Sequence, residues 1–478
     1  MIVMKFGGTS VQDTRAMERV AAIVLARRTE RPVVVLSAMA GVTDSLLAMA
    51  LAAASNRLPE GFRILRALRR RHLAVLESLP SELAHAARQP VLELLDSLQN
   101  ILRGIAALGE LTARTTDHIL CTGELLSSHI MTALLTAHGI AAVRVDSREC
   151  IVTDAKHGSA VPLIEWTNER LRRRLQPLLT GGQVPVMGGY IAATIDGVPT
   201  TLGRGGSDLS AALIGAALKA ARIEIWTDVE GMMTTDPRLC PEAQRIEVIG
   251  FDEASELAYF GAKVLHPATL ISAIEDNIPV YVLDSRSPAN EGTCIRGRAP
   301  RSRTRFRAIA AKLGLKVISI KSPRKLGANG ALRAAFEAFE RHGCAPDLVS
   351  TSEVSVSVAL SSVRDIEPLL ADLRKLGDVE VEDGKAIVCL VGKHIRGQVG
   401  IAASVFETIA AANINVHMIS QGASEINIGL VIEERDVPEA VRRLHSRFFE
   451  AEKQSRAPAL QAVTGGRSVR ARDFVEVG

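Results

Sequence analysis

Short apolar runs alternate with helical patterns over roughly the first 300 residues. The run at 2–6 leads through two glycines into a segment whose apolar residues recur every three or four positions. Further runs lie at 33–39, 141–145, 184–187, 223–226 and 280–283. Nearly continuous apolar runs are typical of parallel strands that helices cover on both faces. The alternation predicts an α/β domain over 1–298, with a mainly parallel sheet sandwiched by helices.

The composition excludes several classes of protein. The 478 residues suggest about three domains. A net charge of +4 and an aromatic content of 3% argue against nucleic-acid binding. No apolar run approaches about 18 residues, so we expect no membrane partner. The N-terminus lacks the apolar core of a secretion signal, and the cysteines are scattered without a C-x-x-C pair. Both features predict a cytoplasmic protein with reduced thiols.

The last third of the chain holds an internal repeat. Residues 330–336 (GALRAAF) and 400–406 (GIAASVF) each open a helical pattern that is followed by two strand-like segments. These segments lie at 348–350, 354–360, 418–420 and 426–432. Each copy has the content of a ferredoxin-like α+β module. The repeat predicts modules at 308–385 and 386–455, a tail at 456–478, and a homodimer or larger homo-oligomer formed through the modules.

Between these parts, residues 285–307 are rich in Ser, Pro, Gly and Arg. Their arginines alternate at 296, 298, 301, 303, 305 and 307, which places them on one side of an extended strand. Two interpretations stay open at this stage: a solvated linker, and a contact for phosphate or nucleic acid.

Residues 5–10 (KFGGTS) follow the first predicted strand and precede a helix. Gly7 and Gly8 allow the backbone to approach a ligand closely, and a helix N-terminus offers unpaired N–H groups to an anion. Lys5 would add a point charge beside a bound phosphate. A plain turn into a helix is the alternative, because the G-x-x-x-x-G-K-[ST] spacing of a Walker A loop is absent.

A second glycine-rich segment, 203–208 (GRGGSD), also opens a helical pattern. Its Arg204 can bind a carboxylate with two parallel hydrogen bonds, beside the positive end of the helix dipole. Asp208 is either an ordinary acid of the first helical turn or a functional acid that orients a cation. Three glycines, a cation and a helix start therefore predict an anion site.

Two further segments carry polar groups suited to a nucleotide. Thr227 and Asp228 follow a strand and, with 234–238 (TTDPR), could form a nucleotide-binding loop or an exposed turn. Residues 261–267 (GAKVLHP) offer Lys263 as a second cation for phosphate.

Three more side chains are candidates for binding a substrate. Ser37 and Thr43 follow the carboxyl end of the second predicted strand, where open α/β sheets place ligands. Glu124 is available for an ammonium group. The pattern shows no Ser-His-Asp arrangement for nucleophilic catalysis and no His or Cys cluster for a catalytic metal.

Taken in order, these motifs resemble those of the aspartate kinase family, within the amino-acid kinase fold. The resemblance covers nearly the whole chain: KFGGTSV at 5–11, GRGGSD at 203–208, Thr227-Asp228 with TTDPR, and GAKVLHP at 261–267. The repeat resembles the tandem ACT modules of this family, most strongly at 350–356 (STSEVSV). The resemblance implies an amino-acid kinase domain followed by two ferredoxin-like ACT modules.

The resemblance also assigns roles to residues. It implies that Lys5 and Asp208 are catalytic, with Asp208 organising the catalytic cations. The implied ATP contacts are Lys5, Phe6, Gly7, Gly8, Thr227, Asp228, Arg238, Lys263 and Val264. The implied aspartate contacts are Ser37, Thr43, Glu124, Arg204, Gly205, Gly206 and Ser207. Met233 departs from the Tyr that many relatives carry near the nucleotide base.

The implied reaction transfers the γ-phosphoryl group of ATP, carried with Mg²⁺, to the side-chain carboxylate of L-aspartate. It opens lysine, threonine and methionine biosynthesis. No general base is needed, because a carboxylate with a pKa of about 4 is already ionised at pH 7. Positioning and positive charge then have to overcome the repulsion between two anions. A kinase for another small carboxylate and a non-catalytic amino-acid sensor are the alternatives.

The ACT modules imply feedback regulation by an end-product amino acid. Asp347 and Ser352 stand where relatives have effector contacts. Lys325 and Ala331 stand where one lysine-sensitive type carries Met and Phe, and a cation at 325 could repel a lysine side chain. The effector could therefore be lysine, threonine, another amino acid, or none.

Overall fold

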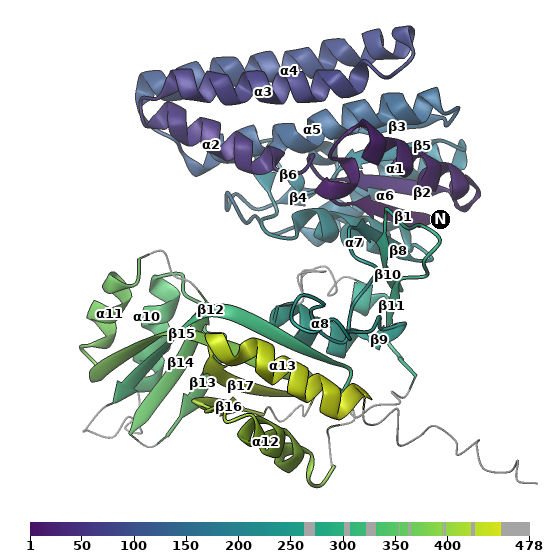
Figure 1. Ribbon diagram of the computed structural model, residues 1–478. Helices are drawn as coiled ribbons and strands as arrows, with labels where there is room; N and C mark the ends of the chain where they lie inside the picture. Colours follow the sequence, from purple (N-terminus) through teal and green to yellow (C-terminus); the bar gives the residue numbers. More distant parts are fainter. Residues whose placement is uncertain are drawn as a thin grey trace, which may run out of the picture.

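The computed structural model describes residues 1–261, 273–300, 306–321, 331–352, 354–361, 365–393, 395, 398–421 and 426–450, and the fold is that of these residues. Figure 1 shows an α/β domain that carries the N-terminus and, beside it, a second body built around its own sheet. The predicted tail at 456–478 lies outside the described residues.

The larger sheet, within the described part of the chain, has eight strands in the order β3-β5-β2-β1-β8-β10-β11-β9. The first six strands of this order are parallel, and β11 runs antiparallel to β10. The mainly parallel sheet is therefore confirmed. The strands are β1 (Ile2–Phe6), β2 (Pro32–Leu36), β3 (Ala142–Val145), β5 (Val184–Gly188), β8 (Ile223–Thr227), β9 (Val248–Gly250), β10 (Val280–Asp284) and β11 (Thr293–Arg296).

The second strand ends earlier than its apolar run predicts. The run continues to residue 39, but β2 ends at Leu36. The Ser37 N–H still donates to the Phe6 carbonyl oxygen (3.1 Å), and the Ala40 N–H then donates to the Gly8 carbonyl oxygen (3.1 Å). The apolar residues after Leu36 therefore belong to a buried loop over the end of β1, and not to the sheet.

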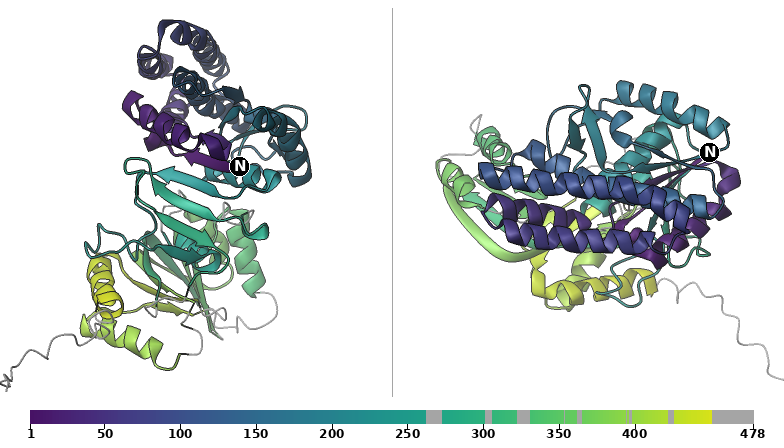
Figure 2. Two further views of the ribbon diagram at one scale, coloured as in Figure 1. Left: turned by 90° about the vertical axis from the view of Figure 1, so that its right-hand side faces the viewer. Right: turned by 90° about the horizontal axis from the view of Figure 1, so that it is seen from above.

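Helices cover both faces of this sheet. One apolar core joins it to α1–α5, and a second joins it to α6–α8. Seen from above in Figure 2, α3 and α4 lie side by side across the domain. The helices are α1 (Thr14–Ala26), α2 (Val42–Ala54), α3 (Leu58–Leu76), α4 (Ser81–Leu108), α5 (Ala113–Ala137), α6 (Ile164–Thr180), α7 (Gly206–Leu218) and α8 (Phe251–Tyr259).

Helix α5 is long and apolar enough to cross a membrane by length and composition alone. However, 83% of its most apolar window is buried inside the protein. It packs against α1–α4 and the sheet, so it is a core helix of this domain. A small sheet, β4 (Val152–Thr153), β6 (Ile191–Thr194) and β7 (Pro199–Thr201), lies beside it.

The arginine-rich stretch at 285–307 is only partly a linker. Its residues Thr293–Arg296 form β11, which adds an antiparallel strand to the large sheet. Arg307 is anchored, with Nε 3.5 Å from the Glu253 Oε2 and Nη2 donating to the Pro300 carbonyl oxygen (3.1 Å). Arg301, Arg303 and Arg305 lie outside the described residues, so the alternating row of arginines stays a prediction.

The second body has, in its described residues, one six-stranded sheet in the order β13-β14-β12-β15-β17-β16. Helices pack on it around two separate apolar cores. Its elements are β12 (Ala308–Lys321), α10 (Ala331–Arg341), β13 (Leu348–Thr351), β14 (Ser355–Ser361), α11 (Glu367–Leu373), β15 (Asp378–Val391), α12 (Ile401–Ala411), β16 (Met418–Ser420), β17 (Asn427–Glu433) and α13 (Val437–His445), followed by a π-helical turn (Ser446–Glu450).

The two α+β modules share their central strands. The register of β12 against β15 shifts between Lys312 and Leu315, next to Gly314 at φ +74°. Residues 308–312 pair with 387–391, beside β17, whereas 315–321 pair with β14 and with the first half of β15. The predicted modules 308–385 and 386–455 are linear pieces of chain, whereas the pairing gives 308–312 to the second module.

Candidate active site

The carboxyl ends of β1, β2, β5 and β8 meet at one edge of the large sheet, and the loops that follow them are hydrogen-bonded to one another. The Gly7 N–H donates to the Trp226 carbonyl oxygen (2.9 Å), and the Gly189 N–H donates to the Leu36 carbonyl oxygen (2.8 Å). Ligands of open α/β sheets bind at such an edge. The predicted glycine loop and the predicted nucleotide strand therefore lie next to each other.

Lys5 and Asp208 form a buried ion pair at this edge. Successive side chains of a strand alternate between faces, so Lys5 lies on the face opposite Met4 and Phe6, towards α7. Its Nζ lies 2.5 Å from the Asp208 Oδ1, and each residue is 9% exposed. Asp208 is thus not only a first-turn acid of α7, because its carboxylate holds a lysine ammonium at the sheet edge.

Two glycines bring backbone segments close together at the site. A Cβ on Gly8 would lie 2.9 Å from the Ala38 carbonyl oxygen, and a Cβ on Gly189 would lie 2.7 Å from the Ser207 Cβ. Both separations are shorter than real Cβ contacts. Gly8 was a predicted site residue, but sequence reasoning missed Gly189. Its signal was the Gly188-Gly189 pair directly after an apolar run.

Glu124 is a buried carboxylate on α5. Its Oε1 accepts the Ala38 N–H (3.1 Å), and its Oε2 has no hydrogen-bond partner among the described residues. Burial raises the pKa of this carboxyl to about 8. An unpartnered buried oxygen is costly unless a ligand supplies a donor, and an ammonium group would do so.

The remaining predicted substrate residues lie in the loops around this pair. The Ser37 carbonyl oxygen accepts the Ser127 hydroxyl (2.9 Å), and Thr43 is in the first turn of α2, just after the buried loop. Arg204 is exposed, between Gly203 and Gly205, which both have left-handed φ angles near +70° (73° and 72°). These glycines let the loop turn sharply before α7, so that Arg204 stands outside the buried pair.

A cavity of about 850 Å³ lies beside this edge. The predicted nucleotide residues Thr227, Asp228 and Arg238 line it. Part of its wall comes from Ile309, Ala310 and Ala311 of β12, which belongs to the C-terminal sheet. Sequence reasoning missed this wall, because it placed a domain boundary just before these residues.

Two polar contacts fix the nucleotide side of the edge. The Arg286 Nη2 lies 3.2 Å from the Asp228 Oδ2, and the Ser285 hydroxyl donates to the Thr227 carbonyl oxygen (3.0 Å). Both partners follow β10 and were missed by sequence reasoning. Arg238 is paired with Asp236 at 2.6 Å, and its side chain is 81% exposed.

One predicted ATP contact differs from the expectation, and two others lie outside the described residues. The Phe6 side chain is fully buried and stacks on Trp226, with ring centroids 6.0 Å apart. It therefore does not line the cavity, because it lies on the core face of β1. Lys263 and Val264 lie outside the described residues, and their approach to Lys5 stays a prediction.

The predicted effector residues lie in the first C-terminal module. Asp347, just before β13, is paired with the Lys312 ammonium and accepts the Ser361 N–H (2.6 Å). Ser352 is exposed, and its hydroxyl lies 2.7 Å from that of Ser355.

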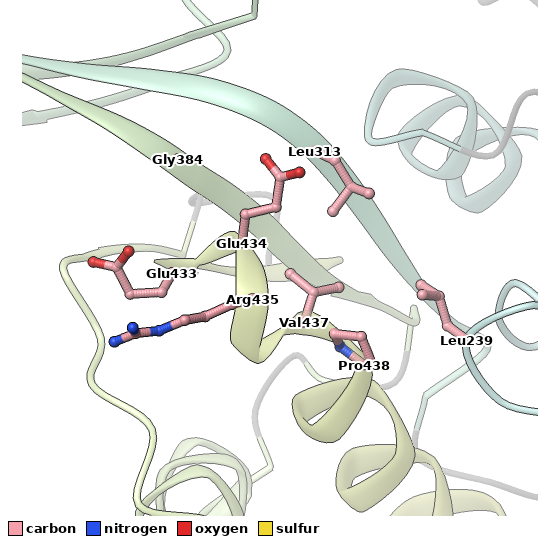
Figure 3. A pocket seen from close by; sticks show the side chains of 8 residues that line it. All are labelled: Leu239, Leu313, Gly384, Glu433, Glu434, Arg435, Val437 and Pro438. Atoms are coloured by element: carbon pink, nitrogen blue, oxygen red, sulfur yellow. The ribbon is translucent and has the colours of Figure 1, made fainter.

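A second hollow, of about 440 Å³, lies where β12 and β15 bend beside the start of α13 (Figure 3). Glu434 lines it and accepts the Gly314 N–H (2.8 Å), whereas Arg435 extends away from Leu313 in the view. None of the predicted site residues lines this hollow.

The parallel sheet with its ion pair and nucleotide-sized cavity defines a small-molecule kinase of the amino acid kinase type. A family model described as "Amino acid kinase family" matches residues 1–284, and one described as "ACT domain" matches 388–448. These matches bear out the predicted fold class.

Individual relatives narrow this class. Lysine-sensitive aspartokinase 3 of Escherichia coli is 38% identical over 458 residues, which cover 94% of this chain and 99% of that one. The crystal structure of E. coli aspartokinase III with aspartate and ADP (R-state) has a TM-score of 0.84 at 37% identity, with the same coverage. That of the enzyme with lysine and aspartate (T-state) has a TM-score of 0.78 at 38% identity over the same coverage. This chain belongs to the aspartokinase family.

Proposed function

We propose that this chain is an aspartate kinase, which transfers the γ-phosphoryl group of ATP to the side-chain carboxylate of L-aspartate and forms 4-phospho-L-aspartate. The observation that carries the proposal is the buried Lys5–Asp208 pair at the same sheet edge as the unpartnered Glu124 oxygen. The Lys5 ammonium suits a phosphate, and the Glu124 carboxylate suits the ammonium of an amino acid.

The residues divide the reaction between them. Glu124 holds the substrate ammonium, while Arg204 and Ser207 bind its α-carboxylate. The side-chain carboxylate of the substrate is already the ionised nucleophile, so the chain has only to align it and offset the repulsion. Lys5 supplies positive charge to the transferring phosphoryl group, and Asp208 holds the Lys5 ammonium in place.

The nucleotide binds in the 850 Å³ cavity, with its phosphates towards Gly7, Gly8 and Lys5. Mg²⁺ binds chiefly through phosphate oxygens and needs few carboxylate ligands. Asp208 and Asp228 carry the hard oxygen donors that suit it at this edge. When bound, the ion supplies further positive charge to the phosphates.

A hydroxylamine trap tests the activity. Purified chain with ATP, Mg²⁺ and L-aspartate should produce aspartyl hydroxamate, because hydroxylamine captures an acyl phosphate as it forms. L-glutamate should give far less, since its longer side chain places the carboxylate about one methylene beyond the phosphoryl group. Equal yields from both amino acids would favour another small-carboxylate kinase, and no hydroxamate at all would favour a non-catalytic sensor.

The C-terminal modules bind an amino-acid effector and pair two copies of a cytoplasmic chain. Asp347 supports the effector role, because the Lys312 ammonium and the Ser361 N–H hold its carboxylate, and an effector ammonium could take the place of the Lys312 ammonium. Titrating lysine and threonine during turnover tests this. If neither changes the rate or the melting temperature, the modules are structural.

The proposed pairing of two copies has its own test. Size-exclusion chromatography with light scattering measures how many copies of the chain associate.

A further inference from the structure

Thr234 sits in the loop that lines the nucleotide cavity, between Met233 and Thr235, which both face it. Its N–H donates to the Gln244 carbonyl oxygen (2.8 Å), and its own carbonyl oxygen accepts the Ile309 N–H (2.7 Å). Its hydroxyl accepts the Gln244 N–H (2.9 Å). Thr234 is thus held by its own loop and by a strand of the C-terminal sheet.

A third residue that contacts Thr234, His445, lies near the C-terminal end of the described chain. His445 is the last residue of α13 and is fully buried. Its Nε2 lies 2.9 Å from the Thr234 Oγ1, and its Nδ1 lies 3.1 Å from the Glu450 Oε1. Its ring stacks on Phe449, with centroids 4.9 Å apart. Both ring nitrogens therefore have partners, and the ring is fixed in orientation.

One arrangement of protons satisfies all the hydrogen bonds around Thr234. Because the Gln244 N–H already donates to the Thr234 oxygen, the hydroxyl proton is available for the His445 Nε2. The Nδ1–H then donates to the Glu450 carboxylate, which could not donate to it when ionised. An imidazole with its proton on Nδ1 satisfies Thr234 and Glu450 together.

We propose that His445 is a positioning residue for the nucleotide, through which the second C-terminal module holds the nucleotide loop in its binding shape. The proposal rests on the proposed function in taking the nucleotide to be ATP or ADP. A loop loses conformational entropy when it is ordered around a ligand, and an anchor from another domain reduces that loss. The anchor is rigid, because α13 is packed into the module core by Val441 and Leu444.

This contact has a consequence for regulation. Movement of the second module relative to the α/β domain would change the Thr234–His445 distance directly, because the two residues belong to the two bodies. Through this contact, the second module can act on nucleotide binding.

The test compares ADP binding by titration calorimetry in full-length variants. His445→Leu should weaken ADP binding roughly five- to thirtyfold, the range expected when a buried hydrogen bond is lost and its partner is left unsatisfied. The KM for ATP should rise by the same factor, while kcat and the KM for aspartate stay within about twofold. His445→Gln, whose amide oxygen can accept from Thr234, should restore most of the affinity.

Thr234→Val removes the same bond from the other side with nearly the same shape. It also removes the acceptor of the Gln244 N–H, so it should weaken ADP binding at least as much as His445→Leu does. The double variant should be no weaker than Thr234→Val alone, because the Thr234–His445 hydrogen bond is already lost in that variant. Additive losses would overturn the proposal.

Two variants separate positioning from general destabilisation. Leu444→Ala opens the core beside His445 but keeps the hydrogen bond, and His72→Leu removes another fully buried histidine, in α3. Leu444→Ala should lower the melting temperature, and neither variant should weaken ADP binding. Unchanged ADP affinity in His445→Leu, or an equal loss in Leu444→Ala, would overturn the inference. The calorimetry does not depend on turnover, so a missing hydroxamate in the wild type would overturn only the proposed function.

Discussion

Lys5, Asp208 and Glu124 come from three elements of one domain, and each is 9% exposed or less. We call this cluster the acceptor half of the site. The nucleotide half, Thr227–Asp228 with 233–238 and 309–311, contains an arginine that is 81% exposed and a wall from the C-terminal sheet. The acceptor half is therefore set by the core of one domain, whereas the nucleotide half depends on how two domains sit together. Regulation through the C-terminal modules can reach the nucleotide without disturbing the buried charges.

The largest effect is expected from Lys5→Ala, in the acceptor half. It should lower kcat by roughly a hundred- to a thousandfold, because the lost charge acts on the phosphoryl group in the transition state. The KM for aspartate should change little. Steady-state kinetics with both substrates varied measures this, with Lys5→Arg as the charge-preserving control. Equal changes in kcat and in the KM for aspartate would make Lys5 a binding residue.

Glu124→Gln should raise the KM for aspartate roughly tenfold or more, since a neutral amide pairs weakly with a buried ammonium. In the wild type, aspartate binding should strengthen as the pH rises towards 8 and Glu124 ionises, and the variant should lose this trend. Isothermal titration of aspartate at several pH values measures both. A wild type whose affinity does not change between pH 6 and 8 would contradict the role of Glu124.

The raised pKa of Glu124 also makes the folding stability depend on pH. Burial raises the Glu124 pKa from 4.5 to about 8, so between these values the folded protein keeps a proton that the unfolded chain releases. The stability of the free protein therefore falls as the pH rises through this window. Glu124→Gln removes that fall, so its melting temperature relative to wild type should rise from pH 5 to pH 8. A constant difference would mean that the raised pKa is absent in solution.

Gly189→Ala should disturb the acceptor half through space alone, because the new Cβ would lie 2.8 Å from the Ser207 Cα. The start of α7, with Asp208, has to move. We expect about a tenfold loss in kcat/KM for aspartate and a smaller change in the KM for ATP. Gly182→Ala, where a Cβ meets nothing within 4 Å but φ is +73°, controls for backbone effects away from the site. Similar losses in both variants would mean that crowding at Ser207 is unimportant.

The smallest effect is expected from Arg238→Ala, in the nucleotide half. An exposed side chain in high dielectric contributes little, so the KM for ATP should rise only about two- to fivefold. Kinetics at low and high salt checks this, because the effect should shrink as salt screens the charge. A loss of activity in Arg238→Ala as large as that in Lys5→Ala would contradict the expectation that the exposed nucleotide half contributes less than the buried acceptor half.

The sequence predicted most of this architecture from local patterns. The apolar runs located six parallel strands to within three residues at each end, because a strand buried on both faces has to be apolar throughout. The repeat revealed the α+β modules, but not that they share β12 and β15, since strand pairing across a bend leaves no local pattern. The Lys5–Asp208 contact joins residues far apart in sequence, so only the family resemblance indicated that both belong to one site.

The residues that sequence reasoning missed have a common physical reason. Gly189 matters because of what packs against it, and Ile309–Ala311 matter because a second domain folds back on the first. His445 resembles an ordinary core residue on an amphipathic helix, and its partner Thr234 is in a loop of the other domain. Contacts between domains depend on the assembled fold, and a single sequence carries no periodic signal for them.

The most direct test is a crystal structure of the full chain with ADP and L-aspartate. The account predicts the aspartate side chain beside Lys5 with its ammonium on Glu124, and the nucleotide in the cavity between the 233–238 loop and β12, with the Thr234–His445 hydrogen bond intact. A nucleotide bound wholly within the α/β domain, without contact with that loop or with β12, would contradict the division of the site into one buried half and one shared half.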